Sequence, residues 1–289
     1  MTQALHGGPA SRAVIPEQVV PYVEAVSGLK ARMFGSCVGY CGPEGEVVLV
    51  GYPLHSPRDG AALDGAVAEA LRFCGAADMT VLAATRPSAA PDGAATTEDV
   101  FWSLPLPLPA PGQKLRNMFR RALREIRITQ GGGDCWTAAH ERIVEDFCAV
   151  RDLEDGSAYI FRRLGEYLER CGQARLFSAW TDDRLMGFAI GEYSSFSTAF
   201  YMFAFRKDAA GPDAPPPGTA DALLAALAAE AENRGHTLLN LGLGINDGIA
   251  FFKKKWGAAP FLPCVTTTWP LRRRGGWLAR LRALWGRRG

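Results

Sequence analysis

The segment LLNLGLGINDGIAFFKKKWGAAPF, from Leu238 to Phe261, carries the strongest signal in this chain of 289 residues. An apolar run passes into alternating glycines, an Asn-Asp pair, an aromatic pair, three lysines and Trp-Gly. Two interpretations compete: a loop that binds a nucleotide, or the end of a β-strand followed by a short helix. The spacing of the glycines separates these interpretations.

A dinucleotide-binding loop has the pattern GxGxxG after the first strand of a βαβ unit. The glycines here are Gly242, Gly244 and Gly248, which form GxGxxxG, and no Lys-Ser or Lys-Thr pair completes a P-loop. A strand that ends at the first two glycines, followed by a helix capped by Asn246 or Asp247, fits better. Glycines inside a strand weaken it and often mark the close approach of a ligand or another backbone.

The composition is that of a folded protein, with 48% hydrophobic and 21% charged residues, and the length suits one large domain or two ordinary ones. No stretch approaches the roughly 20 apolar residues of a membrane span. The N-terminus lacks a signal-peptide core, so we expect a cytoplasmic protein. The seven cysteines form no CxxC pair and the four histidines are isolated, so no metal site is predicted.

Positive charge is concentrated in two stretches of an otherwise acidic chain. The first stretch, 114–127, has six cations and one acid, and the last 18 residues have seven arginines and no acid. In the tail, 272–289, tryptophan and leucine recur at helical spacing among the arginines. This pattern predicts a basic amphipathic tail that binds an anionic membrane surface. The alternative is docking on the protein's own surface or on a second subunit.

The chain is predicted to consist of an N-terminal domain over 1–132, a C-terminal domain over 133–271 and the tail. The glycines at 131–133 mark the boundary. The first domain is expected to contain strands, one helix, an extended edge segment whose prolines exclude a central strand, and a basic helix over 113–128. The second domain is expected to follow the order ααβββαβαβ, with a hairpin that turns at Asp182-Asp183.

The order ααβββαβαβ is similar to the GCN5-related N-acyltransferase (GNAT) fold. The run LNLGLGINDGIAFFKKKWG resembles the closing segment of FemAB-like proteins, which are tandem GNAT domains, and DDRLMGFAIGEYSSFSTAFYMFAF resembles their central hairpin and strand. In the first half, DVFWSLPLPLPAPGQKLRNMFRRALREIRI resembles their extended segment and basic helix. The resemblance implies an α/β (α+β) fold of tandem GNAT-like domains, each with a mixed, mostly antiparallel sheet flanked by helices.

Members of that group transfer an acyl or aminoacyl unit to an amine or hydroxyl, with acyl-CoA or aminoacyl-tRNA as donor. Their acceptors include peptidoglycan precursors and membrane lipids. GNAT acetyltransferases bind CoA pyrophosphate with an (R/Q)xxGxG/A loop at a helix N-terminus. Here that place reads RKDAAGPDAPPPGTADALL, whose prolines remove N–H donors. The departure disfavours a conventional CoA site and favours the tRNA-dependent members.

Such a site would lie where the central strands splay apart, between the third strand of the second half and the glycine-bearing strand. The candidate catalytic residues are Glu192 as general base, Tyr201 as proton donor to the leaving group, and Asn240. The candidate substrate-binding residues are Asn246, Gly242, Gly244, Lys253, Arg116 and Arg120. The competing interpretations are a solvated strand-end glutamate, a core tyrosine and exposed basic helix faces.

The sequence therefore predicts an acyltransferase or aminoacyltransferase that acts on a cell-envelope precursor or lipid at the inner face of the membrane, with tRNA as a candidate partner. Two alternatives stay open. One is a soluble acyl-CoA N-acetyltransferase, and the other is an inactive GNAT-fold binding protein. The sequence specifies neither the donor, nor the acceptor, nor the oligomeric state, and a fold analogy alone does not establish activity.

Overall fold

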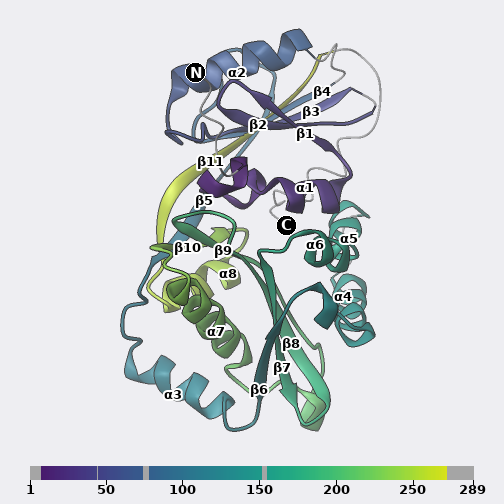
Figure 1. Cartoon of the computed structure of the whole chain (residues 1–289), viewed down its shortest axis with the longest axis vertical. Helices are drawn as coiled ribbons and strands as arrows, with labels where there is room; N and C mark the ends of the chain where they lie inside the picture. The colour runs from purple at the N-terminus through teal and green to yellow at the C-terminus, as the bar shows by residue number, and fades with distance from the viewer. Residues whose placement is uncertain (1–7, 44, 74–77, 152–154, 272–289) are drawn as a thin grey trace.

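One continuous sheet of eleven strands forms the framework of the molecule (Figure 1), in the order β1-β2-β3-β4-β11-β5-β10-β9-β8-β7-β6. The computed structural model describes residues 8–43, 45–73, 78–151 and 155–271, so the predicted tail over 272–289 lies outside it. The sheet runs through both predicted halves because β11 returns from the second half and pairs with β4 and β5. The domain boundary near residue 132 stays a prediction.

The described residues of the first half form five strands and three α-helices. The strands are β1 (Lys30–Phe34), β2 (Cys37–Cys41), β3 (Glu46–Gly51), β4 (Asp78–Ala83) and β5 (Ala95–Pro105). The helices are α1 (Val20–Ser27), α2 (Gly60–Phe73) and α3 (Gln113–Ala122), and a 3-10 turn, η2 (Pro16–Gln18), precedes α1. Helix α2 packs on β3, and α1 contacts α5 and α6 of the second half.

The second half follows the predicted order, except that a strand precedes its helices and the second of the two predicted helices is interrupted at Arg162 and Arg163. Its strands are β6 (Arg127–Gly131), β7 (Ala174–Thr181), β8 (Arg184–Glu192), β9 (Thr198–Arg206), β10 (Leu238–Leu243) and β11 (Ala259–Pro270). Its helices are α4 (Ala138–Val150), α5 (Asp155–Phe161), α6 (Leu164–Arg170), α7 (Thr219–Asn233) and α8 (Asp247–Lys255). Asp182 adopts φ of 50° at the predicted hairpin turn. Within the described residues, no helix has the length and apolar character of a membrane span.

The segment that was expected at a sheet edge is a central strand, which corrects that prediction. Strand β5 lies between β11 and β10 and pairs antiparallel with both. Its interior, from Val100 to Leu104, contains no proline and is apolar except for Ser103. The prolines begin at Pro105, where the strand ends, so none removes a hydrogen bond from the middle of the ladder.

The basic helix is shorter than the predicted range of 113–128. Helix α3 ends at Ala122, and Arg127 already begins β6, which pairs with β7. The residues Ile128 and Thr129 are β-branched and favour the strand, because they pack well on a pleated surface. The amphipathic pattern that extended to residue 128 therefore spans two elements.

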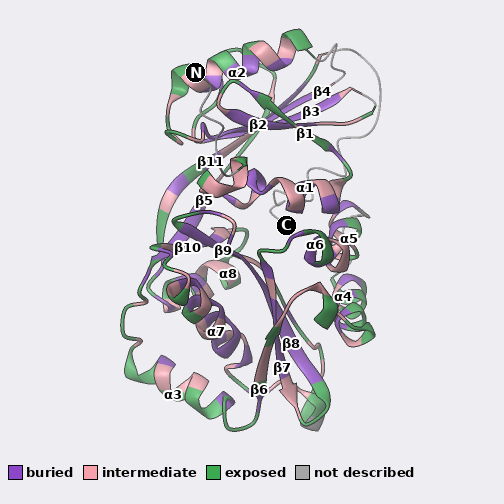
Figure 2. Ribbon diagram, in the orientation of Figure 1, coloured by how far each residue is buried: buried purple, intermediate pink, exposed green. Residues whose placement is uncertain are grey.

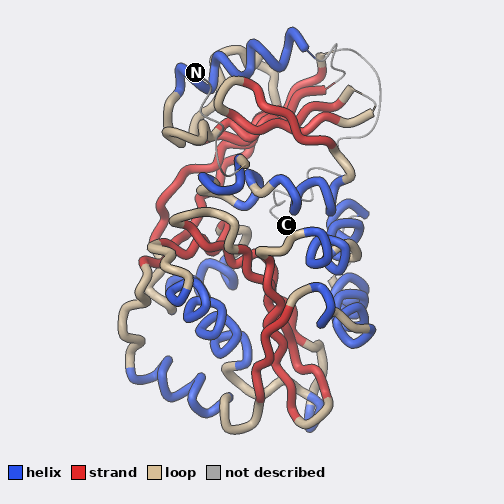
Figure 3. The backbone as a smooth tube through the Cα atoms, viewed as in Figure 1, coloured by secondary structure: helices blue, strands red, loops and turns tan. Residues whose placement is uncertain are grey.

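Two layers of helices cover the lower part of the sheet, with α7 on one side and α4, α5 and α6 on the other (Figure 1). The buried residues follow the strands and the inward face of α7 (Figure 2). Leu224 and Leu227 of α7 contact the face of β7 and β8 that carries Phe177, whereas Phe188 faces α4. The strands trace a twisted path from the upper to the lower part of the molecule (Figure 3).

Buried His140 on α4 predicts that the protein loses stability in mild acid. Its ring stacks on Trp136, and its Nε2 lies 2.9 Å from Ser178 Oγ. Burial lowers the pKa of His140 to about 4, from an ordinary value of 6.5. The folded state therefore binds this proton less readily than the unfolded state does. The free energy of unfolding keeps its full value above pH 6.5 and falls by about 2–3 kcal/mol as the pH drops towards 4. Urea denaturation from pH 7.5 to 4.5 measures this loss.

The matched control is His140→Gln, which keeps a hydrogen-bonding side chain but does not titrate. The variant should be less stable than the wild type at pH 7.5 and should lose less stability between pH 6.5 and 4.5. Equal slopes for the two proteins would show that other groups cause the acid sensitivity.

Candidate active site

The parallel pair β9 and β10 separates after three residues, and this separation creates the site. β10 pairs with β9 only from Leu238 to Asn240, while β9 continues to Arg206. The register of β10 against β5 shifts between Asn240 and Leu243, so the strand carries a bulge there. Gly242 lies in this bulge with φ of 76°, a conformation that a side chain disfavours. The bulge keeps β10 on β5 and leaves the neighbouring edge of β9 open.

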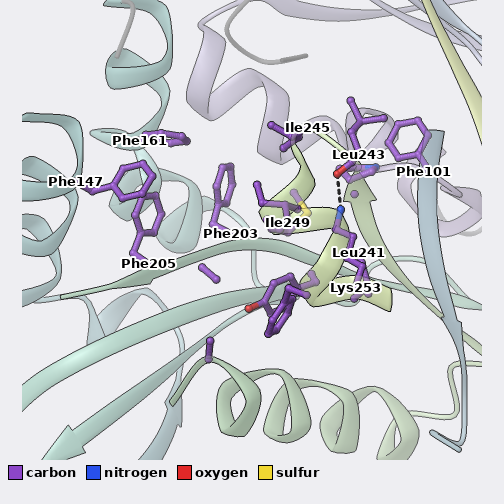
Figure 4. Close-up of a pocket in the computed structure, with 18 of the residues that line it drawn as sticks. Phe101, Phe147, Phe161, Phe203, Phe205, Leu241, Leu243, Ile245, Ile249 and Lys253 are labelled. Atoms are coloured by element: carbon purple, nitrogen blue, oxygen red, sulfur yellow. Dashed lines mark hydrogen bonds between the residues drawn. The ribbon is translucent and has the colours of Figure 1, made fainter. Parts of the chain in front are cut away.

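A cavity of about 410 Å³ opens beside this edge (Figure 4). Residues 201–205 of β9 all line it, as do Leu241, Gly242 and Leu243 of β10. Side chains from both faces of β9 line the cavity, because the cavity extends along the unpaired edge of the strand. A volume of this size is typical of small-molecule sites. The predicted gap between splayed strands is therefore present.

Lys253 of α8 brings an amine into this largely apolar cavity. The residue is 4% exposed, and its Nζ donates a hydrogen bond to the carbonyl oxygen of Leu243 (Figure 4). Burial lowers the pKa of Lys253 to about 7, although Asp99 nearby acts in the opposite direction. The amine therefore exchanges between charged and neutral forms near neutral pH.

The connection from β10 to α8 is held by Asp99 of β5. The backbone N–H groups of Gly244 and Ile245 donate to the two carboxylate oxygens of Asp99, each at 3.1 Å. Ile245 has φ of 58°, which is unusual for a β-branched residue, and its side chain is 46% exposed at the cavity. A Cβ atom at Gly244 would lie 2.9 Å from Asp99 Oδ1, so Gly244 makes room for that carboxylate.

The other side of the cavity is aromatic. Phe147 of α4 and Phe161 of α5 meet Phe203 and Phe205 of β9 (Figure 4). The ring centroids of Phe147 and Phe205 lie 5.0 Å apart, and those of Phe161 and Phe205 lie 5.2 Å apart. Tyr22 of α1 extends the cluster by an edge contact with Phe203 at 5.8 Å. One cavity thus joins an aromatic wall to a buried amine.

Three of the sequence-predicted site residues line the cavity, namely Tyr201, Gly242 and Lys253. Burial, and secondarily the charge of Asp221, raises the pKa of Tyr201, so its hydroxyl stays protonated. Gly244 lies beside Asp99 instead, and Asn246 caps α8 by accepting a hydrogen bond from the N–H of Ile249 at 3.0 Å. Gly242 is therefore required by the bulge, and Gly244 by the close contact with Asp99. Only the bulge adjoins the cavity.

Glu192 lies outside the cavity lining, in a dense hydrogen-bond network. It accepts from the hydroxyl of Tyr167 at 2.7 Å, from Cys171 Sγ at 3.0 Å and from the backbone N–H of Tyr193 at 3.0 Å. The Tyr167 ring in turn contacts that of Tyr22 at 5.2 Å. Glu192 is therefore separated from the cavity by Tyr167 and Tyr22, and its assignment as general base stays a prediction.

Asn240 is fully buried and stabilises the bulge. Its Oδ1 accepts from the N–H of Gly242 at 2.7 Å, and its Nδ2 donates to the carbonyl oxygen of Val14 at 2.8 Å. The second bond joins β10 to the segment that leads into η2, where Gln18 accepts from the N–H of Val14 at 2.7 Å. Asn240 thus positions backbone on two sides of the cavity, and its predicted catalytic role is untested.

Glu17 of η2 is a carboxylate that the sequence reasoning missed. It lines the cavity and is 7% exposed. Among the described lining residues, Glu17 and Lys253 are the two with charged side chains. No motif surrounds Glu17, and it lies more than 200 residues from Lys253 in sequence, so no local pattern groups the two residues.

The two predicted arginines lie on α3, away from the cavity lining. Arg120 is exposed and Arg116 is partly exposed on a helix that packs against α7. Phe119 of the same helix stacks on Trp256, next to the end of α8, with centroids 6.2 Å apart. A role of α3 in binding phosphates stays a prediction.

Solved structures share this architecture at low sequence identity. The C-terminal domain (DUF2156) assigned to a lysylphosphatidylglycerol synthetase from Agrobacterium fabrum has a TM-score of 0.59 and 14% identity, covering 95% of this chain and 92% of that chain. L-PGS from Bacillus licheniformis has a TM-score of 0.54 and 15% identity, covering 99% and 100%. A GCN5-related N-acetyltransferase from Kribbella flavida has a TM-score of 0.52 and 14% identity, covering 95% and 98%.

At these identities the likeness concerns the fold alone. The chain has a mixed α/β fold of the GNAT type, with a large, mostly antiparallel sheet flanked by helices, which confirms the predicted fold class. No family model matches the sequence, and no curated protein matches it.

Proposed function

We propose that this protein is a FemAB-like acyltransferase or aminoacyltransferase, which moves an acyl or aminoacyl group to the hydroxyl or amine of a lipid or lipid-linked acceptor. The observation that carries the proposal is the cavity at the splayed strands, where a buried lysine amine adjoins an otherwise apolar wall. The likeness to the domain assigned to a lysylphosphatidylglycerol synthetase supports a lipid acceptor.

The reaction needs three contributions, and cavity residues are available for each. Attack of a hydroxyl or amine on the donor carbonyl places negative charge on the carbonyl oxygen, which protonated Lys253 would stabilise. Glu17 would accept the proton that the attacking group loses. Tyr201, which stays protonated, would donate a proton to the leaving oxygen. The mostly apolar walls lower the local dielectric constant, which strengthens these electrostatic interactions.

The N-terminus of α7 does not fit the pyrophosphate of CoA in the way that GNAT acetyltransferases use. A Cβ atom at Gly218, which precedes α7, would lie 2.8 Å from the carbonyl oxygen of Met118 on α3, so α3 closely covers this helix end. The first turn also contains the buried carboxylate of Asp221, which opposes a bound anion. This arrangement favours aminoacyl-tRNA over acyl-CoA as the donor.

The proposal is tested by supplying both donors with lipid acceptors. Purified protein is incubated with labelled aminoacyl-tRNA or labelled acyl-CoA and with vesicles of total bacterial lipid, and lipid products are identified by mass spectrometry. We expect a modified lipid with aminoacyl-tRNA, and none with the Lys253→Met variant. If neither donor yields more product than the variant does, the protein binds without catalysis. If acyl-CoA modifies only soluble amines, the N-acetyltransferase alternative holds.

The pH dependence of transfer should reveal Lys253. Because its pKa is about 7 and its protonated form stabilises the oxyanion, the rate should fall about tenfold per pH unit as pH rises above 7. An exposed lysine would stay charged to about pH 10 and cause no such fall. Turnover is measured from pH 6 to 9, with spontaneous donor hydrolysis subtracted at each pH. A rate that is constant or rises to pH 9 would contradict this role.

A further inference from the structure

The cavity is too large and too apolar to be a packing defect. Protein interiors are close-packed, with few voids larger than a water molecule. This cavity measures about 410 Å³ and is bordered by aromatic and aliphatic side chains. An apolar cavity of such a kind offers water few hydrogen-bonding partners and accepts apolar ligands. The side chains thus define the chemistry of a ligand that fits the cavity.

The phenylalanines of the cavity and the Lys253 amine lie on opposite sides. The four phenylalanines of α4, α5 and β9 lie together on one side, and Lys253 lies on the other side, at Leu243 (Figure 4). Ile245, which is 46% exposed, and Ile249 lie between these sides in the same view (Figure 4). A ligand that matches this arrangement has a reacting polar group at one end and an aliphatic chain behind it.

We propose that the aromatic side of the cavity, formed by Phe147, Phe161, Phe203 and Phe205, binds a single aliphatic chain of the substrate while the reacting carbonyl or hydroxyl lies at Lys253. This inference rests on the proposed function for the identity of the reacting group. It adds that the site selects a substrate with a single aliphatic chain. That chain belongs either to the acyl donor or to the lipid acceptor.

Binding without turnover tests the chain site directly. Straight-chain carboxylates from hexanoate to dodecanoate, each below its micelle concentration, are titrated into the full chain by calorimetry at pH 6.5, where Lys253 is mostly protonated. Burial of each methylene should tighten Kd about fourfold until the cavity is full, after which the gain stops. A Kd that does not change with chain length would overturn the inference.

A cavity-filling variant and its matched control locate the chain. Phe203 lies on the aromatic side of the cavity and is only partly buried, so Phe203→Trp should fold and shorten the chain length at which the gain stops. Ala61→Trp, on the exposed face of α2, should behave as the wild type. Equal profiles for all three proteins would place the bound chain elsewhere and overturn the inference.

Competition distinguishes the two sources of the chain. If decanoyl-CoA displaces decanoate and a single-chain phosphatidylglycerol does not, the bound chain belongs to the acyl donor. The reverse result shows that the chain belongs to the lipid acceptor. Displacement by neither compound contradicts the inference. Binding that appears only after removal of 272–289 would make the tail the occupant and would also overturn it. If Kd tightens with chain length but no transfer product forms, this inference holds and the proposed function fails. If transfer occurs but Kd does not change with chain length, the proposed function holds and this inference fails.

Discussion

Replacing Lys253 with methionine should lower the transfer rate by about 10²–10³-fold, the range observed when one group that stabilises an oxyanion is removed. The amine is buried beside the cavity and bonds to the carbonyl oxygen of Leu243. Methionine has a similar length and fills the same space without a charge. The measurement is kcat with saturating donor and acceptor, because a group that acts in the transition state affects kcat and kcat/KM together.

The same substitution should leave the fold intact. The folded pKa of Lys253 is below its ordinary value of 10.5, so the charged form at pH 7 and below costs stability that the neutral form does not. Methionine removes this cost, and we expect the free energy of unfolding at pH 6 to stay equal or to rise. Lys254→Met, an exposed neighbour, is the matched control and should keep its rate within about threefold. A large loss of rate in both variants would argue against a specific role for Lys253.

Replacing Asp221 with alanine should destabilise the protein by about 3–5 kcal/mol, because the change leaves a largely buried cation without its partner. The Asp221 side chain is 5% exposed and lies 2.6 Å from Lys255 Nζ, which is 25% exposed. It also accepts a hydrogen bond from Trp256 Nε1 at 2.9 Å. These contacts join α7 to the end of α8, the helix that carries Lys253. Urea denaturation at pH 7 measures the loss.

An exposed ion pair in the same chain supplies the control. Arg184 and Asp213 lie 2.5 Å apart, but their side chains are 49% and 61% exposed. Solvent screens such a pair, so Asp213→Ala should cost less than about 1 kcal/mol. If the two alanine variants lose the same stability, burial does not strengthen the Asp221 contacts. Combining Asp221→Ala with Lys255→Met should recover part of the loss, because the unpaired charge is then removed.

The elements of the second half were predictable because their signals are local. The apolar spacing that predicts α7 and α8 depends on residues three and four positions apart, and the cap at Asn246 bonds within its own helix. The central position of β5 was not predicted, because the sequence alone does not show that strand pairing ends at Pro105, where the prolines begin. The position of a strand within a sheet depends on partners far away in sequence, which no local pattern reports.

The candidate site was predictable only in part. The glycine-bearing strand and Lys253 were found because their pattern is unusual and contiguous. Glu17 was not found, because the hydrogen bond from the side-chain amide of Asn240 to the carbonyl oxygen of Val14 places its segment at the cavity, and that contact joins residues 226 positions apart. Glu192 was selected as a strand-end acid, but its partners Tyr167 and Cys171 come from α6.

The sequence by itself determined the order of the elements in the second half, the GNAT-type fold class and the place along the chain where the central strands separate. Only the tertiary structure decided that the separation becomes a cavity with an aromatic side, and that Lys253 lies buried at its opposite side. The physical reason is that secondary structure follows from the spacing of neighbouring residues, whereas the pKa of an amine and the shape of a cavity depend on side chains that segments far apart in sequence pack around them.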